Sequence, residues 1–183
     1  MKVGLKSVVD AHFLTLRNLG EEKASKLDLF VFYGIPALLA AASYAFCLKL
    51  SNEVFNASIS VFSIFSALLF SVQVAMYGVF RSDRKATGDL ILDLEEKDLA
   101  EETRKLLREV NANVSYLILV SCSAVTVFLA FFAFNFSPRL ETSALVLFYG
   151  HFLLTVAMVL KRSHEIFDSE YARPLRFKSD SSS

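Results

Sequence analysis

Charge is scarce in this sequence, and it is unevenly distributed. Only 21% of the 183 residues are charged, whereas 54% are hydrophobic and the mean hydropathy is +0.46. Four stretches contain no charged residue, at 29–48, 54–80, 110–138 and 142–160. A helix that rises about 1.5 Å per residue needs roughly 20 residues to cross about 30 Å of hydrocarbon, so each stretch is long enough to span a membrane. This pattern excludes a soluble enzyme domain.

The sequence lacks the residues that several kinds of chemistry require. The absence of Asp, Glu, Lys and Arg from the apolar stretches argues against proton pumps and ion-coupled carriers, which usually place such residues at mid-membrane. The three histidines, at 12, 151 and 164, lack the spacing of metal ligands. The sequence has no Gly-rich phosphate loop and no nucleophile elbow. Cys47 and Cys122 are expected at different membrane depths, which disfavours a disulfide. We therefore expect no catalytic residue, cofactor or metal.

The positions of the basic residues predict the topology. The net charge is zero, but 17 of the 19 basic residues lie before the first apolar stretch, between the second and third, or after the fourth. Positive residues in short loops stay on the cytoplasmic side. We predict an all-α integral membrane protein with four transmembrane helices at 29–50, 54–80, 110–136 and 142–160, and with both termini in the cytoplasm.

The segments outside the spans are also expected to be helical. Residues 1–19, within a cytoplasmic segment 1–28, show an amphipathic helical pattern typical of a membrane-surface anchor or of a partner-binding helix. The connection 81–109 is expected to be a cytoplasmic helical extension, with one continuous helix running from about 94 to 134. The segment 161–183 should form a juxtamembrane helix up to Pro174, with a small basic cluster at 173–178 and a disordered end at 179–183.

The first two spans carry distinctive patterns. Pro36 follows Gly34 and Ile35 inside the first span and predicts a kink, either as a fixed shape or as a hinge. A stripe of small residues runs along the second span at intervals of four, and Gln73 lies in the same span. Such a stripe suits a close helix–helix contact or a pore lining, and both interpretations place this helix in the interior. The stripe consists of Ser63, Ala67, Ser71 and Ala75.

His151 is the only histidine within a span. Titratable residues inside a membrane are candidates for function. Alternatively, a neutral imidazole could simply bond to Gln73, to Tyr77 or to a hydroxyl on a neighbouring helix. The sequence leaves both interpretations open.

Three functional classes agree with these patterns: an oligomeric channel or pore-forming effector, a non-catalytic subunit of a larger membrane complex, and a small carrier-like or lipid-interacting protein. The channel accommodates most features, because several copies around an axis can enclose a path that four uncharged spans cannot enclose alone. Basic residues near the cytoplasmic face would either bind an anionic ligand or contact lipid headgroups. They are Arg81, Arg84, Lys85, Arg104, Lys105, Arg108, Lys161 and Arg162.

The layout resembles the small multi-span membrane effectors of bacterial anti-phage defence systems, such as the Hailong channel component. The surface helix at 5–19, the four spans and the extension at 93–110 with its basic clusters carry the resemblance. It implies a homo-oligomeric ion channel in the bacterial inner membrane that is held shut or opened by a cytoplasmic nucleotide or oligonucleotide. A partner protein is the alternative cytoplasmic ligand that we expect. The lipid bilayer that surrounds the spans is a further expected partner of the protein.

The predicted topology can be tested by labelling single cysteines in sealed cells. A membrane-impermeant reagent added from outside should modify a thiol placed at Asn52 or Glu141, because both lie in the predicted outer loops. It should not modify a thiol at Lys97 or Ser182. Labelling at Lys97 from outside would contradict the topology.

Overall fold

The computed structural model describes residues 4–15, 26–80 and 90–180, and these are helical apart from short connections. They contain no strand, which confirms the all-α prediction. The elements in chain order are α1 (Leu5–Thr15), α2 (Lys26–Leu29), the π-helix η1 (Phe30–Gly34), α3 (Ile35–Ala45), α4 (Asn52–Phe80), α5 (Leu90–Phe134) and α6 (Pro138–Asp180).

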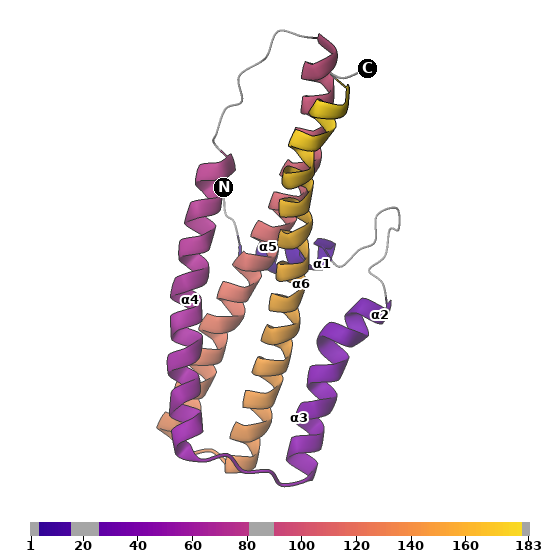
Figure 1. Cartoon of the computed structure of the whole chain (residues 1–183). Coiled ribbons are helices and arrows are strands. Elements are labelled where there is room, and N and C mark those ends of the chain that lie inside the picture. Colours follow the sequence, from indigo (N-terminus) through magenta and orange to yellow (C-terminus); the bar gives the residue numbers. More distant parts are fainter. Residues whose placement is uncertain (1–3, 16–25, 81–89, 181–183) are drawn as a thin grey trace.

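The long helices pack in the order α4, α5, α6 and α3 (Figure 1). Successive long helices run antiparallel, so the connections 46–51 and 135–137 lie at the same end of the molecule. The backbone N–H of Leu50 donates to Thr142 Oγ1 over 3.2 Å and joins the first connection to the start of α6. The end of α4, the start of α5 and the end of α6 lie toward the opposite end, and α1 packs across α5.

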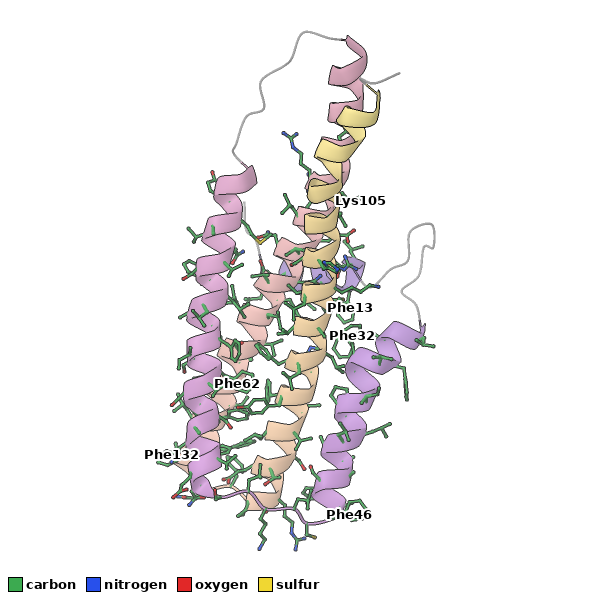
Figure 2. All side chains as sticks on the ribbon, in the orientation of Figure 1. Phe13, Phe32, Phe46, Phe62, Lys105 and Phe132 are labelled. Atoms are coloured by element: carbon green, nitrogen blue, oxygen red, sulfur yellow. The ribbon has the colours of Figure 1, made fainter. Side chains whose placement is uncertain are left out.

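Among the described residues, three helices are long and apolar enough to cross a membrane, over Asn52–Gly78, Arg104–Phe134 and Pro138–His164. A further apolar helix, Phe30–Ala45, is shorter. Large hydrophobic side chains cover much of the outer surface, which is expected where lipid replaces water. Examples at Phe46 and Phe132 appear in Figure 2.

The first apolar helix ends at Ala45, earlier than the predicted residue 50, because a Schellman motif stops it. Cys47 adopts the left-handed conformation with φ 54°. The N–H of Leu48 donates to the carbonyl of Ser43 over 3.1 Å, and that of Cys47 donates to Tyr44 over 3.1 Å. These bonds satisfy carbonyls that would otherwise be left free at the helix end.

Aromatic rings from three helices form the centre of the core. Phe62 of α4 is fully buried, and its ring centroid lies 5.8 Å from that of Phe128 in α5 and 5.3 Å from that of Phe152 in α6. Both contacts are edge-on, an arrangement that aromatic pairs prefer. Phe62 therefore fixes the face of α4 that turns toward α5 and α6 (Figure 2).

The small-residue stripe of α4 faces away from this core. Ser63, Ala67, Ser71 and Ala75 are all exposed. The expectation that this helix lies in the interior is therefore wrong for the single chain, in which α4 is an outer helix. The reason is packing area, because the aromatic face around Phe62 buries far more apolar surface than a row of serines and alanines.

Close helix contact through small residues occurs instead between α3 and α6. The hydroxyls of Ser43 and Ser143 both donate to the carbonyl of Ala40, over 2.8 Å and 3.0 Å. About two turns along α6, Gly150 faces Pro36 so closely that an added Cβ would lie 3.3 Å from the Pro36 Cβ. Glycine and serine thus let the two backbones approach each other.

The two longest helices extend past the end of α4 (Figure 1). The 45 residues of α5 span roughly 68 Å, which confirms the predicted continuous helix through the third apolar stretch. The prediction that α6 ends at Pro174 is wrong, since the helix continues to Asp180. A proline removes one backbone donor but does not always end a helix. The predicted continuation of α4 to about residue 86 lies outside the described residues.

The N-terminal helix is present as Leu5–Thr15, within the predicted range 1–19. It packs against α5, and its side chains His12 and Thr15 are buried. Leu5 and Leu14 remain 71% and 55% exposed. The helix therefore has a docked polar side in addition to exposed apolar residues, and its placement at a membrane surface stays a prediction.

Enlarging Gly150 should destabilise the fold through the contact between α3 and α6. In the Gly150→Leu variant the side chain would push Pro36 away, and overpacking of this kind costs about 1–3 kcal/mol. Gly78→Leu is the matched control, because an added Cβ at Gly78 meets nothing within 4 Å. Thermal unfolding in detergent should show a lower Tm for the first variant only. Equal Tm values would contradict the close contact.

Candidate functional site

A free backbone carbonyl inside the first apolar helix is the starting point of the site. Pro36 has no N–H, so the carbonyl of Phe32, four residues earlier, lacks its usual helical partner. The chain adopts the π-helix η1 just before the proline, where the N–H of Ile35 donates to the carbonyl of Phe30. Single π-turns inside α-helices are frequent at functional sites. The Phe32 carbonyl is left available to another helix.

His151 of α6 satisfies that carbonyl. Its Nδ1 lies 2.9 Å from the Phe32 oxygen, and a carbonyl only accepts, so Nδ1 carries the proton. In the neutral imidazole Nε2 is then an acceptor, and it receives a hydrogen bond from the Tyr116 hydroxyl over 2.8 Å. The expectation that a hydroxyl on a neighbouring helix serves His151 is confirmed. Gln73 bonds elsewhere, donating to Ser115 Oγ over 2.7 Å.

Tyr33 extends the chain of hydrogen bonds to the π-helix. The Tyr116 proton is used by His151, so Tyr33 donates to the Tyr116 oxygen, 3.1 Å away. The Tyr33 ring also packs against the His151 ring at a centroid distance of 4.8 Å. The order of donors is therefore fixed from Tyr33 through Tyr116 and His151 to the Phe32 carbonyl, and it ties η1, α5 and α6 together.

The N-terminal helix docks directly on this chain. The ring of His12 stacks on Tyr116 with a centroid distance of 3.8 Å and an interplanar angle of 2°. Phe13 stacks on Tyr33 at 5.6 Å. Phe13 and Phe32 lie at a similar level along the molecule in Figure 2. The aromatic contacts place α1 over one end of the hydrogen-bonded chain.

Asn113 of α5 provides the polar contact to α1. His12 Nδ1 lies 2.8 Å from Asn113 Oδ1, and the Thr15 hydroxyl donates to the same oxygen over 2.8 Å. In the described part of the chain, His12 Nε2 and Asn113 Nδ2 are buried without a hydrogen-bond partner. A buried polar atom without a partner costs about 1–3 kcal/mol. Docking of α1 therefore combines specific contacts with a substantial penalty.

Arg162 of α6 closes the junction at the C-terminal end of α1. Its guanidinium pairs with the carboxylate of Glu109 and donates to the backbone carbonyl of Thr15. A cation is favourable at this end of a helix, where the carbonyls are free. The three helices α1, α5 and α6 thus meet around one ion pair.

Burial makes His12 hard to protonate. Loss of water around the ring is the main cause, and the nearby His151 and Arg162 also act to lower the pKa of His12, to about 4 from 6.5. The hydrogen bond to Asn113 acts in the opposite direction but is weaker. His12 is therefore neutral in the docked helix at ordinary pH.

A cavity of about 300 Å³ lies beside the hydrogen-bonded chain, between η1, α3, α5 and α6. Tyr33, Tyr116 and His151 line its polar part, and apolar residues line most of the rest. No three ligating side chains gather to hold a metal in residues 4–15, 26–80 and 90–180.

The residues predicted from the sequence lie in different places. His151 is part of the site, and Arg162 joins the α1 junction through its ion pair with Glu109. The basic residues Arg104, Lys105, Arg108 and Lys161 are exposed on α5 and α6. Positions 81, 84 and 85 lie outside the described residues.

Sequence reasoning missed His12, Tyr33, Asn113 and Tyr116 as site residues. One usable signal was present, since Pro36 necessarily frees the carbonyl four residues before it. An asparagine inside an apolar stretch is a second signal, because Asn113 needs a partner there. Nothing local in the sequence indicated that α1 would supply that partner.

The chain matches no protein-family model, no curated protein and no solved structure. Its site is therefore interpreted from its own geometry.

Docking of α1 should weaken as the pH falls from 6.5 toward about 4. The pKa of His12 is lower in the docked helix, so the released helix binds more protons in this interval and acid favours release. Electron-spin distances between labels at Ser7 and Lys105, in a chain without its native cysteines, should report the change. His12→Gln should abolish the pH dependence, whereas His164→Gln should keep it. A distance unchanged down to pH 4 would contradict this mechanism.

Proposed function

We propose that the chain is the subunit of a homo-oligomeric ion channel that is controlled from the cytoplasmic side. The observation that carries this proposal is the uncovered small-residue face of α4, which points away from the core of the single chain. The same features also fit a non-catalytic subunit of a larger membrane complex, and the experiment below separates the two.

The face of α4 suits contact with a second copy. Its hydroxyls are satisfied within the helix, since Ser63 donates to the Ile59 carbonyl over 2.8 Å and Ser71 donates to the Ala67 carbonyl over 3.1 Å. Small side chains let helix backbones approach closely and gain van der Waals contact along the whole crossing. Because α4 is at one edge of the row of helices, a neighbouring subunit can reach the face along its length.

The same helix could line a pore when several copies surround an axis. A single row of helices encloses no aqueous path, whereas a ring of subunits does. The serine hydroxyls of α4 can contact water, and the exposed Ile64 and Phe70 flank them. A constriction of such apolar side chains closes a pore by excluding water.

The proposed subunit has four membrane helices, of which the first comprises α2, η1 and α3. This helical run covers residues 26–45 and rises about 30 Å, which is enough to cross the hydrocarbon. It packs along α6. The concentration of 17 of the 19 basic residues in three segments supports cytoplasmic termini. The ends of α5 and α6 beyond α4 would then lie in the cytoplasm.

Control from the cytoplasm would act through these helical ends. Arg104, Lys105 and Arg108 on α5 and Lys161 on α6 are exposed, and Figure 2 shows Lys105 at about the level where α4 ends. Several subunits would bring these cations into a ring that suits the phosphates of a nucleotide or oligonucleotide, or an acidic partner protein. A ligand bound there would act on α5, which packs on α4.

Leucine substitutions on α4 test the assembly. Ser63→Leu, Ala67→Leu and Ser71→Leu should each raise the subunit dissociation constant roughly tenfold, or about 1.4 kcal/mol, because they separate the backbones. The matched control is Ala157→Leu, which makes the same change at an exposed position of α6. Native mass spectrometry in mild detergent measures the oligomer.

Ion flux into liposomes tests the channel with the same variants. The unaltered protein and Ala157→Leu should conduct, and the variants that lose the oligomer should not. A protein that is monomeric in detergent and in lipid would refute the proposal. Electrically silent liposomes, together with a stable hetero-complex recovered from cells, would establish the alternative of a complex subunit.

A further inference from the structure

The cavity beside the hydrogen-bonded chain has one polar end and one apolar end. Tyr33, Tyr116 and His151 mark the polar end, next to the docked α1. The rest of the lining lies farther from α1. It continues from Tyr33 to Pro36 of α3, from Tyr116 to Ser123 of α5, and from His151 to Leu147 of α6. The seven helical steps from Tyr116 to Ser123 extend roughly 10 Å. The cavity is therefore elongated parallel to the helices.

The polar end offers hydrogen-bond acceptors and has no donor to spare. The Tyr33 proton is used by the Tyr116 oxygen, the Tyr116 proton by His151 Nε2, and the Nδ1 proton of His151 by the Phe32 carbonyl. The phenolic oxygens keep unused lone pairs, because each hydroxyl can accept two hydrogen bonds. A complementary ligand group must therefore donate a proton.

The charge of the ligand follows from the same lining. A carboxylate or phosphate at the polar end would meet acceptor oxygens and find no donor there. An ammonium group would donate, but none of the described residues that line the cavity is charged, so its charge would be buried without a counter-ion. An uncharged hydroxyl group fits both conditions.

The surroundings of the cavity indicate where such a ligand comes from. The helices α5 and α6 are long and apolar enough to cross a membrane, and Ser123 and Leu147 of the lining are exposed in the single chain. Toward the polar end, α1 covers Tyr33 and Tyr116 with Phe13 and His12. The open part therefore faces hydrocarbon, and its natural occupant is a molecule already dissolved in the bilayer.

We propose that this cavity binds the aliphatic chain of an uncharged membrane amphiphile, whose hydroxyl group donates a hydrogen bond to the phenolic oxygen of Tyr33 or Tyr116. The aliphatic chain of the ligand lies along Leu147 and Ser123, parallel to the helices. A volume of about 300 Å³ suits one chain and is at the lower end of the range for ligand sites. The ligand touches the residues on which α1 docks, so its binding is linked to the position of α1.

Photolabelling of the full chain in lipid nanodiscs tests the site. A photoreactive medium-chain 1-alkanol should label peptides of η1, α5 and α6 around the cavity. The unlabelled alkanol should compete roughly two- to tenfold better than its methyl ether, which accepts but does not donate, because a net hydrogen bond contributes about 0.5–1.5 kcal/mol. The carboxylic acid of the same chain length, in its ionised form, should compete least.

Two variants separate the apolar and polar parts of the site. Ser123→Leu fills the end of the cavity that holds the aliphatic chain and should reduce labelling severalfold. Ser63→Leu on the outer face of α4 should leave labelling unchanged. Tyr33→Phe removes one of the two phenolic acceptors and should reduce the preference for the alkanol over the ether while labelling by the ether chain persists, which also shows that the variant is folded. Labelling of the Ser63→Leu protein at a concentration at which it is monomeric keeps this test independent of oligomer formation and conduction.

Three results would overturn the proposal. The first is labelling spread equally over the lipid-facing side of α4 and unaffected by Ser123→Leu. The second is equal competition by the alkanol and its methyl ether, which would show that no donor is recognised. The third is the strongest competition from the ionised carboxylic acid, which would show that the site binds an anion.

Discussion

One unpaired backbone carbonyl organises the polar interior of this protein. Hydrocarbon provides no partner for a free carbonyl, so a group released by a proline must be satisfied by the protein itself. Pro36 releases the carbonyl of Phe32, and His151 of α6 donates to it. The proline also lies against Gly150, where the two helices come closest. The position of α3 against α6 and the protonation pattern of His151 therefore have the same cause.

The direction of the hydrogen bonds follows from this single donor. With the proton on Nδ1, His151 accepts from Tyr116, and Tyr116 in turn accepts from Tyr33. This series of hydrogen bonds leaves phenolic oxygens as the free polar atoms of the cavity. It also holds the Tyr116 ring where it stacks with His12. A kink that the sequence alone would describe as either a fixed shape or a hinge is thus held by contacts from two other helices.

The sequence predicted the features that depend on local pattern. The all-α class, the long apolar helices and the continuous helix α5 follow from hydropathy and from the lack of helix-breaking residues. Sequence reasoning failed to predict which side of α4 is buried. Both sides of this helix are apolar enough for lipid, and only the aromatic contacts of Phe62 decide between them. It failed equally for His12 and Asn113, whose partnership joins residues about a hundred positions apart.

The energetics of the α1 junction suggest why it is built from polar groups. Apolar side chains alone would hold the helix more firmly, but here His12 Nε2 and Asn113 Nδ2 are buried in the described structure without partners. Each such atom offsets part of the gain from stacking and from the Arg162 contacts. The contacts define one position for the helix, while the unpartnered atoms reduce the free energy gained by docking, and elements that move during regulation come from the less stable parts of a fold. Because the same Tyr116 ring contacts His12 and bonds to His151, release of α1 would be felt at the π-helix and along α6.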